Sequence, residues 1–296
     1  MVLRFFRPEP KPGVPPYGNF GDELNPWLWP RLLPDAFDDV PSVAFFGIGS
    51  LLGTPKHDDA IMRHKIIFGA GAGQADAARR EPADGRWMFY CVRGPLTAGA
   101  YGLDPDLAVT DPALLLASLY KPAGAKGHRV AFMPHISQAL AWEGLLRDAC
   151  QRASVRYIDP RESVDDILAK ISSSELLLAE AMHCAIAADA LRVAWIPVHT
   201  TPRTHVFKWR DWCEAMALPF RPRRLLNLSN LARRLGLPHS RGLARASAGA
   251  LGGMLATCAR RQQPYLSDES VHANRLARLH DRLETFRKDV AAGLFR

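Results

Sequence analysis

Cysteine is scarce in this chain of 296 residues, and the cysteines that it has stand far apart. The five are Cys91, Cys150, Cys184, Cys213 and Cys258, and no two of them form a C-x-x-C pair. Disulfide scaffolds and structural zinc sites need cysteines in even sets or at close spacing. The sequence therefore argues against both kinds of protein and indicates a reducing compartment.

Long hydrophobic runs without charge are also missing. The first 13 residues lack the apolar core of a secretory signal peptide. The most apolar long stretch, 176–198, contains Glu180, His183, Asp189 and Arg192, which argues against a membrane-spanning helix. We therefore expect a cytoplasmic protein.

Negative charge is scarce in the last third of the chain. Residues 203–296 contain 18 Lys and Arg but seven Asp and Glu, whereas residues 1–202 contain 20 and 23. The formal net charge of +8 thus comes entirely from the C-terminal region. This distribution argues against nucleic-acid binding by the main body and favours an anionic partner for the C-terminal region.

Short apolar runs alternate with helical patterns along most of the chain. The runs are rich in β-branched and aromatic residues and are separated by Gly, Pro or Asp. Expected strands are 43–48, 65–68, 87–92, 107–109, 129–133, 155–158, 175–179 and 193–198. Expected helices include 23–33, 95–101, 137–149, 164–172, 181–191, 241–261 and 268–294. Alternation of buried strands with helices predicts an α/β fold with parallel sheets.

A segment rich in Gly, Pro and Lys at 120–128 divides this alternating pattern into two halves. We therefore expect an N-terminal α/β lobe over 1–122 and a C-terminal α/β lobe over 123–225. The last region, 226–296, has helical patterns but no strand pattern, which predicts a basic helical tail.

Glycine loops follow two of the expected strands, at 46–50 and at 68–73. Such loops can bind phosphate through backbone N–H groups and the dipole of the next helix. Neither loop continues into the full dinucleotide motif, so NAD binding is not expected. A third glycine loop opens the helix near residue 23, where Asp22 either caps the helix or binds sugar hydroxyls together with Asn19.

Polar side chains stand where three expected strands end. Arg93 precedes a helix and suits a carboxylate or phosphate ligand, or else a structural ion pair with Asp111. His135 follows the strand at 129–133. Glu180 and His183 are three residues apart, which indicates an acid/base pair on one helix face, with a packed core histidine as the alternative.

Together these motifs resemble the polysaccharide pyruvyl transferase family. The matching segments are GNFGDELN (18–25), FGIGS (46–50), FGAG (68–71), VRGPLTA (92–98), DPALLL (111–116), MPH (133–135) and EAMHCAIAADALRV (180–193). The segment FKWRDWC (207–213) is similar to the branch that modifies succinoglycan-type exopolysaccharides. The family commonly has Arg-Leu-His where this chain has Ala181-Met182-His183, so a donor-binding arginine is absent there.

The resemblance implies two Rossmann-like lobes similar to glycosyltransferase type B. It also implies transfer of the carboxyvinyl unit of phosphoenolpyruvate to a sugar of an exopolysaccharide repeat unit, without a cofactor or metal. His183 and Glu180 would be the catalytic residues. Donor-binding residues would be Arg93, His135, Lys208, Gly47, Gly49 and Ser50. Acceptor-binding residues would be Asn19, Asp22 and Asn25.

The implied partners are phosphoenolpyruvate and a glycan acceptor, expected to be a lipid-linked oligosaccharide. Nucleic acid is not among them. The basic tail suggests peripheral contact with an anionic membrane at its inner face, and a helical cover over the two lobes is the alternative. A nucleotide-sugar glycosyltransferase on the same fold remains a second functional hypothesis, although no acidic ribose ligand is evident. A non-catalytic polysaccharide-binding homologue is the third, and Ala181 is the feature that favours it.

Overall fold

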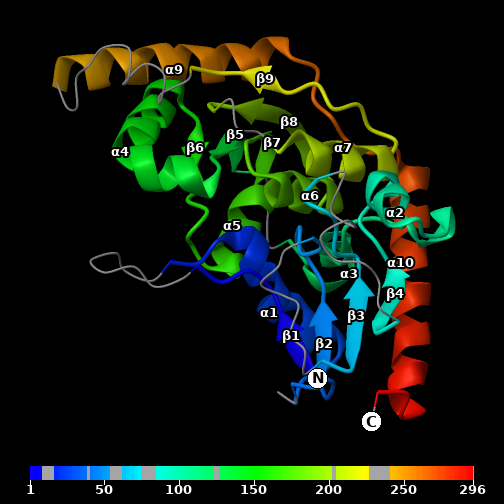
Figure 1. Ribbon diagram of the computed structural model, residues 1–296. Helices are drawn as coiled ribbons and strands as arrows, with labels where there is room; N and C mark the ends of the chain where they lie inside the picture. The colour runs from blue at the N-terminus through cyan, green and yellow to red at the C-terminus, as the bar shows by residue number, and fades with distance from the viewer. Residues whose placement is uncertain are drawn as a thin grey trace.

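The computed structural model describes residues 1–8, 17–38, 41–53, 62–74, 85–122, 127–201, 205–226 and 241–295, with only the backbone given at 241–245. Two parallel sheets with surrounding helices make up the fold (Figure 1). The predicted α/β class with parallel sheets is therefore confirmed.

The first sheet has four strands in the order β1-β2-β3-β4. All neighbouring pairs run parallel. Its strands are β1 (Val2–Arg4), β2 (Val43–Phe46), β3 (His64–Phe68) and β4 (Trp87–Cys91). Every residue of β2 is buried, as expected for a central strand that is covered on both faces.

The second sheet has five strands in the order β6-β5-β7-β8-β9, again all parallel. Its strands are β5 (His128–Met133), β6 (Arg156–Tyr157), β7 (Ser174–Ala179), β8 (Ala194–His199) and β9 (Arg223–Arg224). The apolar stretch 176–198 thus forms two neighbouring strands and the helix between them, not one long helix.

The helices connect the strands as crossovers or flank them. The ones used below are α1 (Phe20–Leu32), α2 (Pro95–Tyr101), α4 (Ile136–Ala153), α5 (Val164–Ser172), α6 (Met182–Ala190) and α7 (Val206–Ala215). Two further short pieces are η4 (Pro112–Leu115) and α3 (Leu116–Leu119). The predicted bounds of α2 and α5 agree with the structure.

The prediction of a strand at 107–109 is wrong. A 3₁₀ turn, η3 (Pro105–Leu107), occupies its start, and Ala108 makes only an isolated bridge to Val92. The reason is local, because the Asp104 side chain accepts from the Asp106 N–H and Pro105 has no N–H for a sheet.

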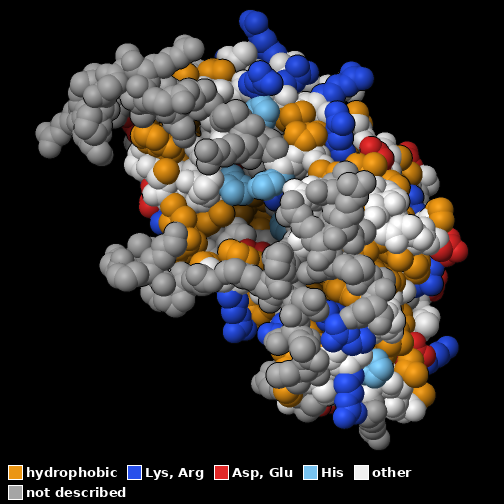
Figure 2. Space-filling view, viewed as in Figure 1, with side chains coloured by type: hydrophobic (Ala, Val, Ile, Leu, Met, Phe, Trp, Pro, Cys, Tyr) orange, Lys and Arg blue, Asp and Glu red, His pale blue; other side chains and the backbone are white. Residues whose placement is uncertain are grey.

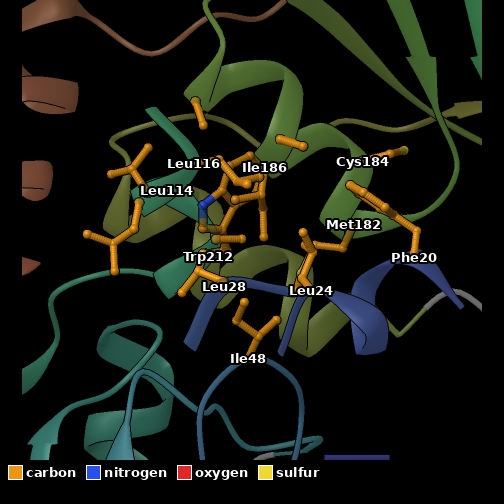
Figure 3. Close-up of a cluster of buried hydrophobic side chains, with 14 of the residues drawn as sticks. Phe20, Leu24, Leu28, Ile48, Leu114, Leu116, Met182, Cys184, Ile186 and Trp212 are labelled. Carbon is orange, nitrogen blue, oxygen red and sulfur yellow. The ribbon is translucent and has the colours of Figure 1, made fainter. Parts of the chain in front are cut away.

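One hydrophobic cluster spans both sheets. It contains Phe45 and Ile66 from the first sheet and Ala131 and Leu177 from the second. Figure 3 shows side chains of α1, η4, α6 and α7 that point into its centre. Because α1 and α6 pack against one another at this centre, the carboxyl ends of strands in the two sheets are held close together.

The two helices of the C-terminal region attach to different lobes. Helix α9 (Arg241–Arg261) packs on α4, and its Leu251 lies in a cluster with Phe132 of β5. Helix α10 (Glu269–Ala291) runs beside β4 (Figure 1), and its Phe286 lies 5.0 Å from Tyr90 between ring centroids. Helices α9 and α10 therefore complete the hydrophobic clusters of the second and the first sheet, respectively. Within the described residues, no helix is both long and apolar enough to cross a membrane.

Candidate functional site

Titratable side chains from the first turns or caps of four helices come together between the two lobes. The helices are α1, α4, α6 and α7, and each follows or faces the carboxyl end of a strand. Helix N-termini carry unpaired N–H groups and a positive dipole, so several of them together favour an anion. Figure 2 shows histidine side chains gathered in a hollow near the centre of one face.

His183 lies in the first turn of α6, and 14% of its side chain is exposed. Its Nε2 is buried without a hydrogen bond and lies 3.5 Å from Asp111 Oδ2. The other ring nitrogen packs against α1, because a Cβ atom added to Gly21 would lie 2.1 Å from His183 Nδ1. The imidazole is thus held between the start of α1 and the aspartate of η4.

Asp111 is fully buried at the start of η4. Its Oδ1 accepts a hydrogen bond from the Ala113 N–H at 3.0 Å, which fixes the carboxylate. Its Oδ2 has no hydrogen-bond partner and faces His183. A buried carboxylate oxygen without a donor is costly, and His183 Nε2 is the ring nitrogen that stands opposite it.

Lys208, in α7, is half-buried among charges of both signs. Burial and the positive charge of Arg93 lower the pKa of Lys208 to about 8, against the opposing effect of Asp22 and Asp111. Its ammonium group forms no hydrogen bond or ion pair with the residues that the structure describes. Burial raises the pKa of Asp22, although Asn19, His183 and Lys208 act in the opposite direction.

His135 and His205 surround the same ammonium group. His135 caps α4, with Nδ1 accepting from the Ser137 N–H, and His205 caps α7. Burial, Lys208 and His205 lower the pKa of His135 to about 4, so the imidazole is neutral near pH 7. Burial and Lys208 also lower the pKa of His205. Lys208 thus disfavours the protonation of both histidines, and a bound anion at this place would favour it.

Glu180 does not pair with His183 in the structure. Its Oε1 accepts from the Thr200 N–H at 2.5 Å and the Thr200 hydroxyl at 2.7 Å, and its Oε2 accepts from the His135 N–H at 3.1 Å. Burial raises the pKa of Glu180, and these hydrogen bonds oppose the rise. The expected shared helix face is absent because α6 begins only at Met182, which leaves Glu180 at the end of β7. The carboxylate therefore ties the ends of β5, β7 and β8 together.

Arg93 is fully buried, and its guanidinium group is hydrogen-bonded to other groups of the protein. Its Nε donates to Asp211 Oδ2 at 3.0 Å, its Nη1 to Ser50 Oγ at 2.9 Å and its Nη2 to the Ala72 carbonyl at 2.7 Å. The structure thus favours the structural ion pair over the ligand contact, and the partner is Asp211 of α7 in place of the predicted Asp111. Asp211 also accepts from the Thr97 N–H and hydroxyl, so the pair joins α7 to the first lobe.

The glycine loops make room for buried side chains. A Cβ atom on Gly47 would lie 2.0 Å from Trp29 Nε1, and one on Gly71 would lie 2.2 Å from Arg93 Cζ. Gly49 has a φ of 130°, a conformation that favours glycine. These contacts give the glycines a packing role that the sequence motif alone does not reveal.

The expected acceptor residues divide into two kinds. Asn25 is buried, and its side chain bonds the Ile48 N–H and carbonyl, the Trp29 indole and the Asp22 carbonyl. It therefore holds the loop after β2. Asn19 and Asp22 are partly exposed and joined by a hydrogen bond of 2.6 Å from Asn19 Nδ2 to Asp22 Oδ2. Asp22 lies in the first turn of α1 and Asn19 is the cap, since the helix begins three residues earlier than predicted.

Of the residues predicted for the site, the structure brings Asp22, His135, His183 and Lys208 together. It adds two that sequence analysis missed in this role, Asp111 and His205. Asp111 stands in the DPALLL motif and could have been found there. The sequence around His205 carries no motif that indicates a site, because only the packing of α7 places this residue near His135.

Two parallel sheets with basic side chains and a histidine–aspartate pair between their strand ends define an α/β protein whose candidate site suits an anionic ligand. The model of the polysaccharide pyruvyl transferase family matches residues 7–200. Since this is more than half of the chain, the chain belongs to the polysaccharide pyruvyl transferase family, as the sequence motifs indicated.

A similar protein is the succinoglycan biosynthesis protein ExoV of Rhizobium meliloti (strain 1021), which is 40% identical over 211 residues. The match covers 71% of this chain and 65% of ExoV, so it spans less than two thirds of that relative. No solved structure matches the chain.

Proposed function

We propose that this protein transfers the carboxyvinyl unit of phosphoenolpyruvate to a sugar of an exopolysaccharide repeat unit, which yields a pyruvate ketal and phosphate. The observation that carries the proposal is the cluster of Lys208, His135 and His205 beside the pair His183–Asp111 in a chain of this family. Membership of the family and the similarity to ExoV support an enzyme of exopolysaccharide biosynthesis. The two-lobed arrangement also supports the proposed likeness to glycosyltransferase type B.

The donor carries a carboxylate and a phosphate, and both need positive groups. Lys208 supplies a positive charge that is not neutralised by a close side-chain partner, and His135 supplies a ring nitrogen next to it. Lys208 thus provides a cation where the family arginine is replaced by Ala181. Because an anion favours the protonated forms of Lys208 and both histidines, donor binding near pH 7 to 8 is expected to take up protons.

The chemistry requires proton transfer at a carbon atom. In the proposed step, His183 in its protonated form gives a proton to the methylene carbon of the donor, which leaves positive charge on the adjacent carbon. A sugar hydroxyl oxygen bonds to that carbon, and its proton passes to the neutral imidazole. A second hydroxyl of the same sugar then bonds to the carbon while the carbon–oxygen bond to phosphate breaks. Phosphate leaves with the electron pair of that bond and takes up the proton of the second hydroxyl.

Asp111 acts in this proposal as the positioning residue for His183. The carboxylate orients the ring through Nε2, which lies 3.5 Å from Asp111 Oδ2. Asp111 takes the place that the sequence motif assigned to Glu180, whose oxygens already accept three hydrogen bonds. Asn19 and Asp22 remain the proposed acceptor contacts, because they are the partly exposed polar residues on the α1 side of His183.

The test combines the purified chain with phosphoenolpyruvate and an oligosaccharide acceptor, free or lipid-linked, and measures phosphate release and ketal formation by NMR. His183→Ala is expected to lower turnover at least ~100-fold. His280→Ala is the matched control and should keep turnover, since His280 lies on α10 and its Nε2 is hydrogen-bonded to the Ser118 hydroxyl of α3. Turnover near normal in His183→Ala would refute the assignment.

The same assay separates the other two hypotheses. Release of a nucleoside diphosphate from a nucleotide sugar, with no reaction of phosphoenolpyruvate, would favour a glycosyltransferase. Glycan binding without any turnover would favour a non-catalytic homologue. We also propose that the acceptor is lipid-linked and that the basic C-terminal region contacts an anionic membrane peripherally.

A further inference from the structure

Most arginines of α10 are already engaged by the protein. Arg278 and Arg282 both form ion pairs with Asp106, and Arg275 donates to the Ala215 carbonyl. Arg287 donates to the Leu32 carbonyl and pairs with Glu284. The arginines of this helix are therefore engaged in contacts within the protein.

The arginines around β9 and the end of α9 behave differently. Arg223 and Arg224 of β9 are exposed, as are Arg260 and Arg261 at the end of α9. Within the part of the chain that the structure describes, none of these four forms an ion pair or a side-chain hydrogen bond. Figure 2 shows Lys and Arg side chains gathered at the upper edge of the molecule, where Figure 1 places α9 and β9.

The same region is hollowed and partly apolar. A hollow of about 580 Å³ lies between β9 and α9, with Arg223, Arg224 and Met254 in its lining. A second hollow of about 320 Å³ shares Arg223 with it and includes Leu266. Met254 is 36% exposed and Leu266 38%, which makes them two of the six exposed large hydrophobic side chains in the described chain.

The outer face of α9 carries no charge over three turns. Its exposed residues from 246 to 257 are small or apolar apart from Thr257, whereas the solvent face of a helix is normally polar. An uncharged helix face with a rim of arginines suits the surface of an anionic membrane. The following residues are named the α9–β9 surface: Arg223, Arg224, Met254, Arg260, Arg261 and Leu266.

We infer that the α9–β9 surface binds the headgroup region of an anionic lipid bilayer. The four guanidinium groups contact lipid phosphates, for which their planar donor geometry is suited. Met254 and Leu266 enter the interfacial layer between headgroups. No inserted helix is needed, because several cations act together at a negatively charged surface.

This surface stands close to the candidate site. Arg224 pairs in register with His199 at the end of β8, and the next residue, Thr200, holds Glu180. A bilayer on the α9–β9 surface would therefore lie beside the site, where a lipid-linked acceptor would be presented. The inference deepens the membrane contact proposed above by naming its surface. The consequence for the acceptor rests on the proposed reaction, whereas binding to the bilayer is independent of that reaction.

The experiment is co-sedimentation of the full chain with phosphatidylcholine vesicles, with and without phosphatidylglycerol, at about 50 mM and about 500 mM salt. The test variant removes four charges: Arg223→Gln, Arg224→Gln, Arg260→Gln and Arg261→Gln. The matched control removes four exposed charges elsewhere: Arg63→Gln, Lys121→Gln, Arg129→Gln and Lys288→Gln.

We expect the unmodified chain to bind the anionic vesicles at low salt and to leave them at high salt. The test variant should lose at least ~100-fold in partitioning, and the control variant less than ~10-fold. Inorganic phosphate should release no more protein than sodium chloride of equal ionic strength. Phosphate release from phosphoenolpyruvate with a free oligosaccharide should be the same in both variants, which separates this inference from the proposed function.

Equal loss of binding in both variants would show that only net charge matters and would overturn the inference. Absence of binding to anionic vesicles at low salt, or equal binding to neutral ones, would do so too. Retention of the chain by a soluble anionic polysaccharide but not by vesicles would assign the surface to a different partner. Circular dichroism of each variant checks that the fold is intact.

Discussion

Substitution of Gly21 by alanine tests whether the position of His183 controls turnover. Gly21 lies in the first turn of α1, and an added Cβ atom would stand 2.1 Å from His183 Nδ1 and 2.8 Å from its Cγ. Both distances are far below van der Waals contact, so the imidazole must move away from Asp111. A displacement of about 1 Å at a catalytic group can cost ~100-fold in rate.

The effect on stability is the balance of two terms. Overpacking costs ~1–3 kcal/mol, whereas alanine in place of glycine within a helix gains ~1 kcal/mol. We therefore expect the free energy of unfolding to fall by ~0–2 kcal/mol while turnover falls ~100-fold. Gly99→Ala in α2 is the matched control, because a Cβ atom there meets nothing within 4 Å. That variant should keep its turnover and gain up to ~1 kcal/mol.

The assays are phosphate release for turnover and urea denaturation for stability, carried out on both glycine variants and in a His183→Ala background. Removing the imidazole removes the two closest clashes, so Gly21→Ala should no longer destabilise the protein in that background. The reasoning is refuted if Gly21→Ala turns over as fast as Gly99→Ala. It also fails if the loss of stability is the same with and without the imidazole.

Three further outcomes follow from the site. Asp111→Asn keeps the Oδ1 acceptor but loses the negative charge, so turnover should fall on the order of 10- to 100-fold and the pH–rate profile should shift, with little change in the KM for the donor. Because the pKa of Lys208 is lower in the folded than in the unfolded chain, the unfolded chain holds more protons between pH 8 and pH 10.5. The free energy of unfolding therefore rises with pH across this range, and at pH 7 the charged Lys208 side chain destabilises the fold. Lys208→Met should therefore raise the melting temperature by ~1–4 °C while raising the KM for the donor, and an unchanged KM would remove Lys208 from the donor site. Asp211→Ala leaves Arg93 buried without its partner and should lower the free energy of unfolding by ~3–5 kcal/mol in urea denaturation, whereas a loss below ~1 kcal/mol would show that the pair is not a structural tie.

The order of strands and helices was accessible from the sequence because it depends on local signals. Apolar runs such as the one in β2, and the serine cap of α5 at Ser163 with acidic residues after it, act within a few residues of the chain. The same locality explains the errors. The strand expected at 107–109 is absent because Asp104 and Pro105 start a 3₁₀ turn there. Strand β9 was missed because its two residues are too few to show the alternation of a strand.

Motif order also determined the family and placed His183 in the site, since the histidine occupies the start of a helix after a buried strand. The partners of the titratable groups were decided by tertiary structure alone. Arg93 pairs with Asp211 across 118 positions of the chain, and His183 faces Asp111. Glu180, close to His183 in sequence, turned instead toward Thr200 and His135 because the helix begins after it.

The sequence by itself therefore determined most of the elements, the parallel class of the sheets and the family. The tertiary structure decided which charges are neutralised inside the protein and which remain available to a ligand or a surface. The physical reason is that helix and strand formation depends on neighbours a few residues away, whereas the state of a charge depends on burial and on the groups within a few ångströms of it. Those groups are supplied by sheet order and helix packing. Helix α7 brings Lys208 to His135, and the packing of α10 pairs its Arg278 and Arg282 with Asp106.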